Sequence, residues 1–453
     1  RDPSKLKAEV RSEPDTMGCE SQVLNQDEGI DTVAQEFKEL DMTEDEEKDF
    51  FEKEEEVEKG VGKKKKTWLQ SVHKGVMKRS SSFTGFFGGA KPSPGLADEE
   101  NAVVQKVMSN RSPMASENGG VRIQDPTQAT LVRSVLSLML RQMGRQLLKG
   151  QNMMNVSFPI ECCQPKSILE IAAMQGGYFN KFLPRAAATN DPVERLRLVV
   201  SCFVASMTLT SGNFLKPLNP VLGETLQVDY EDGAKAYLEQ TCHHPPVSSF
   251  LLEGPGAQYR YYGYTTFAIG FGMNKMLLKN RGLRVLEFAD GGKIDIGFPD
   301  DRWGNVFWGE MHHETLGEWV FTDEANALRA TITFNPPPKS KSSKSPPSDY
   351  FIGCIDKYDP AEPEKKGSQL CGIEGSWVGF CEFNRERSWH HTDGPIVAHG
   401  TPTDRTVLPS DSTKRGDRNA LALKDYKLAQ SEKTRLENVQ RAERKLREGQ
   451  GSG

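Results

Sequence analysis

The sequence lacks the patterns that mark several large classes of protein. Its 453 residues contain no run approaching the roughly 18–20 apolar residues that cross a bilayer, so any membrane contact should be peripheral. None of the eight cysteines forms a CxxC pair, and no secretory signal opens the chain. We therefore expect reduced thiols in a cytosolic protein. Because the chain begins at Arg1 rather than Met, we expect a fragment or a processed form.

Motifs for catalysis are also missing. There is no GxSxG elbow, and no cysteine lies in an evident thiolate-activating setting, so we predict a protein that is not an enzyme and needs no cofactor. Six of the eight histidines occur as adjacent pairs, at 243–244, 312–313 and 390–391. His312-His313-Glu314 has the residue types of a metal site without HExxH spacing. We predict no metal, and a histidine-rich metalloprotein is the alternative.

Charge is segregated along the first quarter of the chain. Residues 1–123 are polar and poor in β-branched and aromatic residues, which predicts disorder. An acidic block near 43–55 contains Asp49, Phe50, Phe51 and Glu55, and it resembles the motif of two phenylalanines in an acidic tract. That motif implies binding to the vesicle-associated-membrane-protein-associated receptors of the ER, by acidic steering followed by anchoring of the rings. A solvated acidic helix is the alternative.

The next block, residues 63–91, is basic and interleaved with aromatic side chains. Lysines beside Trp68, Phe83, Phe86 and Phe87 suit an anionic membrane surface. Nuclear import or affinity for nucleic acid is the competing interpretation. The net charge of −5 argues neither for nor against nucleic acid as a property of the whole chain. We predict no nucleic-acid partner. We interpret Lys91–Gly120 as a linker.

Three helices are predicted before the β-rich part of the chain. In Leu131–Lys149 apolar residues recur at spacings of three and four, which favours a core helix or a mobile cover for a cavity. Ser167, with Glu170 three residues later, is a capping-box signal for a second helix. Asp191-Pro192 opens a third helix that runs to about Thr210.

Short runs of β-forming residues, separated by Gly, Asp and Asn turns, fill residues 215–334 and predict a barrel or a sandwich. Among them we expect separate strands at Lys275–Leu278 and Arg284–Phe288, and another at Asn305–Trp308. A further strand is predicted at Gly375–Phe383. One long charged helix is predicted at Leu421–Glu448.

Three distant stretches carry polar groups that could hold an anion. Prolines and Gly223 fix the irregular segment 215–225, which leaves Lys216 and Asn219 as donors. The prolines after His243 and His244 should end a strand and leave both imidazoles at a rim. Spacing of four places Lys433, Glu437 and Arg441 on one helix face, which alone would indicate an exposed salt-bridge ladder.

Together these stretches resemble the ligand domain of the oxysterol-binding-protein-related family. The resemblance rests on Glu239-Gln240-x-x-His243-His244-Pro245-Pro246-Val247-Ser248, with Lys-Pro-x-Asn-Pro before it and Glu-Lys-x-x-Leu-Glu-x-x-Gln-Arg near the end. It covers residues 124–448 and leaves 449–453 as a flexible tail. It implies a β-rich α+β fold: an incomplete antiparallel β-barrel around a hydrophobic lipid tunnel, with an N-terminal lid and a C-terminal helical region.

The resemblance also implies a function. Such a protein would exchange phosphatidylinositol 4-phosphate for a sterol or phosphatidylserine between membranes, peripherally in the cytoplasm and at ER contact sites. A lipid-sensing scaffold without net transport is the alternative. The headgroup would be bound by Lys216, Asn219, His243, His244, Lys433, Glu437 and Arg441. The lid over the tunnel would include Leu131, Val135, Leu136, Met139, Leu140 and Met143.

Overall fold

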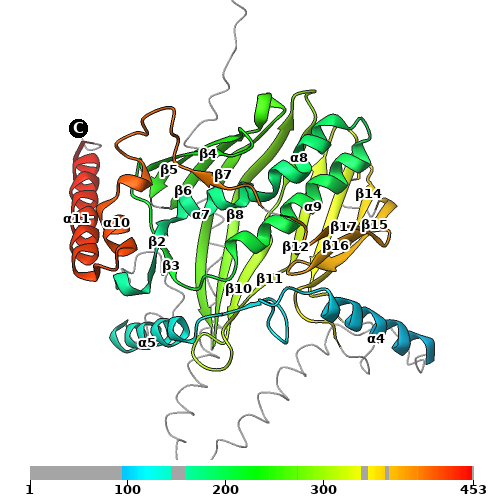
Figure 1. Ribbon diagram of the computed structural model, residues 1–453, viewed down its shortest axis with the longest axis horizontal. Coiled ribbons are helices and arrows are strands. Elements are labelled where there is room, and N and C mark those ends of the chain that lie inside the picture. The colour runs from blue at the N-terminus through cyan, green and yellow to red at the C-terminus, as the bar shows by residue number, and fades with distance from the viewer. Residues whose placement is uncertain are drawn as a thin grey trace, which may run out of the picture. The chain divides into compact units, whose positions relative to one another are not determined.

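The computed structural model describes residues 94–143, 159–243, 245–272, 274–337, 345–362, 367–394 and 396–450 (Figure 1). In these ranges one antiparallel sheet of 16 strands dominates the chain. Its main path runs in the order β17-β16-β15-β14-β13-β12-β9-β8-β7-β6-β5-β4-β18, and β10 and β11 continue from β8. The path does not return from β18 to β17, so the sheet is not closed, as the predicted incomplete barrel requires.

The strands of this sheet are β1 (Val121–Arg122), β4 (Thr225–Tyr230), β5 (Lys235–His243), β6 (Pro246–Glu253), β7 (Tyr259–Gly272), β8 (Lys275–Phe288), β9 (Lys293–Ile296), β10 (Asp300–Gly304), β11 (His312–Leu316), β12 (Glu318–Asp323), β13 (Leu328–Phe334), β14 (Tyr350–Lys357), β15 (Ser368–Ser376), β16 (Phe380–Phe383), β17 (Glu386–His390) and β18 (His399–Gly400). A separate parallel pair joins β2 (Cys163–Ser167) to β3 (Lys216–Leu218). Most predicted strands are present, with shifted ends.

Three strand predictions are wrong. Residues 275–288 form one strand, because continuous pairing with β7 carries β8 through Gly282 despite its positive φ of 132°. Asn305–Trp308 is a loop that starts at a left-handed Asn305, and the flanking strands β10 and β11 were not predicted. The run 375–383 turns at residues 377–379, so that β15 and β16 pair with each other.

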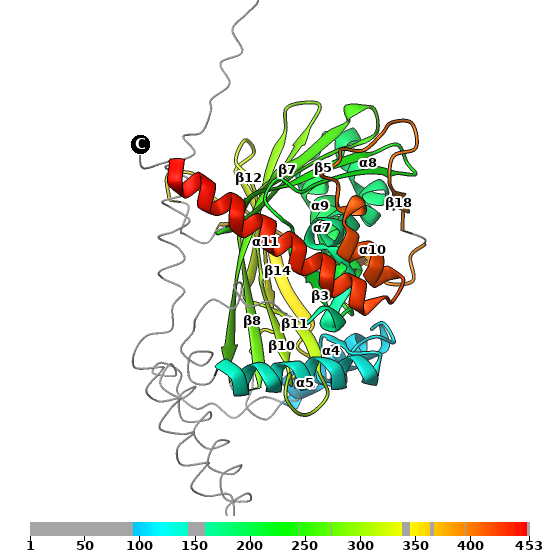
Figure 2. The ribbon, with the colours of Figure 1, turned by 90° about the vertical axis from the view of Figure 1, so that its left-hand side faces the viewer.

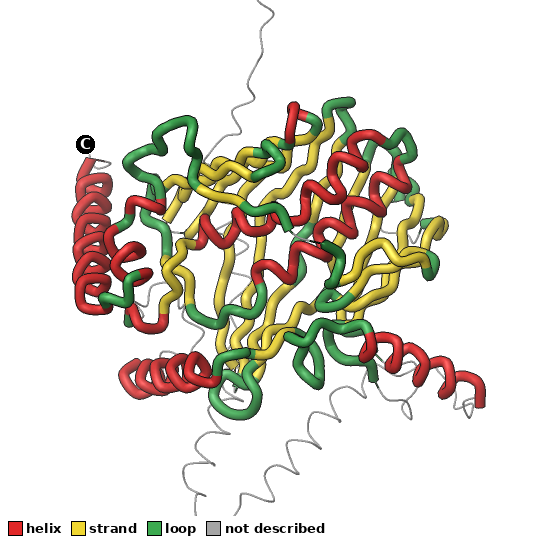
Figure 3. The backbone as a smooth tube through the Cα atoms, viewed as in Figure 1, coloured by secondary structure: helices red, strands yellow, loops and turns green. Residues whose placement is uncertain are grey.

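The helices pack against the sheet and around its edges (Figure 3). They are α4 (Pro94–Ser109), α5 (Pro126–Met143), α7 (Ile168–Met174), α8 (Phe179–Ala188), α9 (Pro192–Thr210), α10 (Gly416–Ala422) and α11 (Tyr426–Gln450). The predicted caps are confirmed, since Ser167 and Glu170 form a capping box and the Asp191 carboxylate accepts from the Val193 amide. Helix α8 was not predicted, and it contains Pro184.

Aromatic side chains join the helices to the sheet. The Phe203 ring of α9 lies 5.2 Å from Tyr261 of β7 and 6.1 Å from Phe321 of β12, between ring centroids. It also packs 5.5 Å from Phe179 of α8. Such pairs add about 0.5–1.5 kcal/mol each beyond the burial of their area. These contacts pack α8 and α9 against the sheet.

Two predictions at the ends of the described chain need correction. The expected linker at 91–120 contains α4, whose Val107 is fully buried beside Tyr350 and Phe380 and whose Lys106 Nζ lies 2.6 Å from Glu382 Oε2. The expected single helix at the C-terminal end is divided, because Lys424 adopts a φ of 60° between α10 and α11. Figure 2 shows α11 running obliquely beside α10. None of the described helices is long and apolar enough to span a membrane.

Candidate functional site

A cavity of about 430 Å³ lies between the helices and the inner face of the sheet. Its wall is mostly apolar. It includes Phe179 and Phe203 from the helices, and Leu238, Phe250 and Leu278 from the strands. Cavities of this size and character bind small apolar ligands. The arrangement can hold a lipid chain and exclude water from it.

Lys216 and Asn219, both predicted as donors, line this cavity. Lys216 starts β3, where it is aligned with Cys163 of β2, and Asn219 follows directly after that strand. The Asn219 Oδ1 atom is buried and has no hydrogen-bond partner among the described residues. A buried amide without a partner is costly, so this position is prepared for a polar group of a ligand.

The stretch with two histidines forms the end of a hairpin. β5 ends at His243 and β6 begins at Pro246, which confirms the predicted strand end. The buried Gln240 holds the hairpin together, because its Oε1 accepts from Ser248 Oγ at 2.6 Å and its Nε2 donates to the Cys242 carbonyl at 2.7 Å. His243 is the last residue of β5 and is half-buried, and it is not among the residues that line the cavity. His244 falls outside the described residues.

Lys433, Glu437 and Arg441 form the predicted ladder on α11. The Lys433 Nζ lies 3.1 Å from Glu437 Oε1, and Arg441 Nη2 lies 3.2 Å from Glu437 Oε2. The side chain of Lys433 is only 13 % exposed, whereas that of Arg441 is 64 % exposed. The lysine end of the ladder therefore faces the protein, and the arginine end faces solvent.

Lys216 interacts electrostatically with Lys433 and Glu437 of the ladder. Burial lowers the pKa of the Lys216 ammonium from its ordinary value; nearby Cys163 raises it, Lys433 lowers it further, and Glu437 raises it. Burial likewise raises the pKa of the Cys163 thiol, and both lysines lower it. Lys216 and Lys433, more than two hundred residues apart in the sequence, therefore influence each other electrostatically. Two lysines that interact in this way are suited to an anion.

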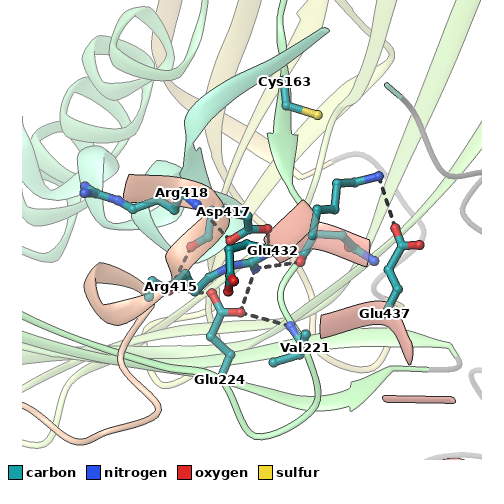
Figure 4. Close-up of polar contacts among 12 residues, drawn as sticks. Cys163, Val221, Glu224, Arg415, Asp417, Arg418, Glu432 and Glu437 are labelled. Carbon is teal, nitrogen blue, oxygen red and sulfur yellow. Dashed lines mark hydrogen bonds and ion pairs between the residues drawn. The ribbon is translucent and has the colours of Figure 1, made fainter. Parts of the chain in front are cut away.

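Arg415 connects the segment that contains Asn219 and Glu224 to the start of α10. The sequence analysis did not predict this role. Its Nη1 donates to Glu224 Oε2 and to the Asn219 carbonyl, both at 2.8 Å, and its Nη2 donates to Asp417 Oδ2 at 2.7 Å (Figure 4). Glu224 and Asp417 are buried. Burial raises the pKa of Glu224, and the Arg415 charge opposes that shift. The segment 219–224 is thereby fixed to the start of α10.

Comparison with known proteins identifies the family. The family model described as oxysterol-binding protein matches residues 143–452. "Oxysterol-binding protein 9" of Dictyostelium discoideum is 32% identical over 348 residues, which cover 72% of this chain and 79% of that protein. The chain belongs to the oxysterol-binding protein family. "Oxysterol-binding protein homolog 6" of Saccharomyces cerevisiae is 26% identical over 327 residues, 67% of this chain and 70% of the relative.

Solved structures support the family fold. The Osh3 ORD from Saccharomyces cerevisiae, crystallised with PI(4)P, aligns with a TM-score of 0.55 at 20% identity, over 73% of this chain and 88% of that one. The Osh1 ORD domain in complex with cholesterol aligns with a TM-score of 0.58 at 20% identity, over 79% and 90% of the two chains. At this identity they establish the shared fold.

The lid predicted for an oxysterol-binding domain corresponds to α5. The helix begins at Pro126, five residues earlier than expected, because the Asp125 carboxylate accepts from the Thr127 amide at 2.8 Å and caps it. Val132 lines the cavity, and Arg133 Nη2 donates to the Asn305 carbonyl at 3.1 Å. Leu131 is half-buried. The structure does not describe the side chains of the other predicted lid residues, Val135, Leu136, Met139, Leu140 and Met143. The acidic motif with Asp49, Phe50, Phe51 and Glu55 also lies outside the described residues.

His312 and His313, the candidate residues of the metal alternative, contact different partners. His312 Nε2 lies 3.5 Å from Glu314 Oε2, and Arg302 holds the same oxygen at 2.6 Å. His313 points elsewhere, with Nε2 3.1 Å from Asp301 Oδ1, so adjacent histidines do not converge on one ion. Among the described residues no group of three or more potential ligands could hold a metal.

The Arg415 network predicts a large loss of stability on its removal. Arg415→Met leaves two buried carboxylates without their cation, which should lower the free energy of unfolding by about 3–5 kcal/mol. Urea denaturation followed by circular dichroism measures this change.

Arg405→Met is the matched control. Arg405 pairs with Asp229 at 2.7 Å, but both side chains are partly exposed, at 27% and 30%. Its loss should cost no more than about 1 kcal/mol. Equal effects of the two substitutions would contradict the structural role assigned to Arg415.

Proposed function

We propose that this chain binds phosphatidylinositol 4-phosphate, extracts it from membranes and exchanges it for a second lipid, a sterol or phosphatidylserine. The observation that carries the proposal is the electrostatic interaction between Lys216, which lines the apolar cavity, and Lys433, which is more than two hundred residues away in the sequence. A phosphorylated headgroup would bind to the lysines, and its acyl chains would enter the cavity.

The chemistry of the headgroup matches these residues. Its two phosphates carry several negative charges, and charge-assisted hydrogen bonds from lysine are about twice as strong as neutral ones. Asn219 supplies an amide at the cavity wall, and His243, with His244, would contribute donors that gain protons beside an anion. Glu437 would orient Lys433, which it contacts at 3.1 Å, and Arg441 would act from the outer turn of the helix.

The cavity supports the transfer step. Each buried CH₂ group contributes about 0.8 kcal/mol, so a lipid would not leave into water, and exchange would occur at a membrane with α5 displaced. Two similar solved structures are complexes of those proteins with PI(4)P and with cholesterol, which favours this pair of lipid classes here. Competition for one cavity would couple the two transfers.

The proposal includes a location, at ER contact sites in the cytoplasm. It rests on the acidic motif at 49–55 and the basic segment 63–91, which would bind the ER receptor and an anionic membrane. A lipid sensor without transport would use the same binding residues. A transfer assay between donor and acceptor vesicles separates these functions, because only a transporter moves labelled lipid catalytically.

Charge on the inner side of α11 should control extraction. Lys433→Met should weaken extraction of phosphatidylinositol 4-phosphate from vesicles by about 10- to 100-fold, since a charged hydrogen bond to phosphate is lost. Arg435→Met on the same helix is the control, because Arg435 is 58% exposed and pairs with Glu432. Equal extraction by the two variants would count against the proposed headgroup site.

The lowered pKa of Lys216 predicts a pH dependence of binding. Below that pKa the lysine is charged with or without ligand, and affinity is greatest. An anion raises the pKa in the complex, so affinity should fall by up to about tenfold per pH unit as pH rises from the free towards the bound pKa. Calorimetry in buffers of different ionisation enthalpy should detect proton uptake there, and Lys216→Met should abolish it. Uptake unchanged in that variant would rule out Lys216 as the titrating group.

A further inference from the structure

The wall of the cavity contains a buried cation that the headgroup site does not use. Arg284 lies on β8, and its exposed fraction is 7%. Along β7 and β8 the residues that line the cavity alternate, with Phe267, Ile269 and Tyr261 on one strand and Leu278 and Arg284 on the other. The cross-strand partner of Arg284 is Gly263, which has no side chain, so the guanidinium has room over the inner face of the sheet.

The guanidinium has aromatic neighbours and too few hydrogen-bond acceptors. Its Cζ lies 3.7 Å from the centroid of the Phe298 ring and 5.7 Å from that of Trp319. Its Nε and Nη2 atoms have no hydrogen-bond partner among the described residues. The adjacent Tyr261 hydroxyl interacts with the guanidinium, but it has no partner of good hydrogen-bond geometry in the described chain. Stacking on aromatic faces stabilises the charge and leaves the N–H groups at the guanidinium edge available.

The nearest carboxylate is already committed to other donors. Asp301 influences Arg284 electrostatically, but no carboxylate of the described chain lies within 4.0 Å of it. The Asp301 Oδ1 atom accepts from Thr315 Oγ1 at 3.2 Å and lies 3.1 Å from His313 Nε2, and its Oδ2 accepts from Asn280 Nδ2 at 3.0 Å. Burial lowers the pKa of Arg284, and Tyr261 and Asp301 oppose that shift. An arginine nevertheless stays charged in proteins.

The strand register separates this cation from the headgroup site. Val247, next to the end of the β5–β6 hairpin, is aligned with Thr266 and, across β7, with Arg281. Arg284 lies three residues further along β8, about 10 Å, and three strands across from β5, about 14 Å. The two places are therefore distinct positions on the sheet.

We propose that Arg284 and Tyr261 form a second polar subsite, which binds the carboxylate of a lipid whose apolar body fills the cavity. A carboxylate matches the planar guanidinium with two parallel hydrogen bonds and supplies the missing counter-charge, whereas an alcohol offers one weaker acceptor. The inference rests on the proposed binding of lipids in the cavity, and it assigns an acidic lipid as a further ligand of that cavity.

The test compares two lipids that share a chain and differ in the end group. Binding of palmitate and of hexadecanol to the full chain is measured by isothermal titration calorimetry at pH 8, where the acid is ionised. The wild type should prefer palmitate by about 10- to 100-fold. Arg284→Met should remove that preference by weakening palmitate binding far more than hexadecanol binding, because the alcohol loses at most one weaker hydrogen bond. Tyr261→Phe, which keeps the ring, should reduce the preference less.

The outcomes separate this subsite from the headgroup site. Equal affinities in the wild type, or a preference that persists in Arg284→Met, would overturn the proposal. If neither lipid binds while phosphatidylinositol 4-phosphate is still extracted, the subsite is refuted and the proposed function stands. If palmitate is preferred through Arg284 and no phosphoinositide is extracted, the subsite stands and the proposed function fails. Lys433→Met should leave the preference for palmitate unchanged.

Discussion

The ion pairs of Arg415 are the interaction on which the candidate site depends. This side chain bonds Glu224, Asp417 and the Asn219 carbonyl, and thereby joins the segment before β4 to the helices that end the domain. A buried network of this kind is stable only when each charge keeps its partners. It explains how two lysines that are distant in sequence can be kept close together despite their mutual repulsion. The energy that holds them is supplied by the scaffold, and an anionic ligand would relieve the repulsion.

The cavity adds a second constraint, because its polar groups lie in an apolar wall. Lys216 and Asn219 occupy one part of the wall, and Arg284 with Tyr261 occupies another. Phe203, Phe179 and Trp319 exclude water between the helices and the sheet, which strengthens each electrostatic contact inside. The same low-dielectric surroundings penalise polar groups without partners, so a bound lipid that satisfies them gains affinity and a defined orientation.

Local signals in the sequence predicted local structure well. The capping box at Ser167, the proline start of α9 and the strand end at His243 each depend on neighbouring residues, and each is confirmed. The continuous β8 was missed because pairing with β7 overrides the break that Gly282 indicates. Arg415 and Arg284 were missed because a charged residue is expected at the surface. Their partners come from distant strands and helices, which the sequence alone does not bring together. The family fold was available from the histidine-proline stretch, but the positions of Asn219 and Lys433 in it needed the structure.

The central claim is that one cavity holds either of two lipids, with the phosphoinositide headgroup fixed at Lys216 and Lys433. The most direct measurement loads the protein with labelled phosphatidylinositol 4-phosphate and titrates it with vesicles that contain a sterol or phosphatidylserine. The account predicts that one of these lipids releases the label in proportion to its own uptake, as a shared cavity requires. Retention of the label on protein saturated with the second lipid would contradict it.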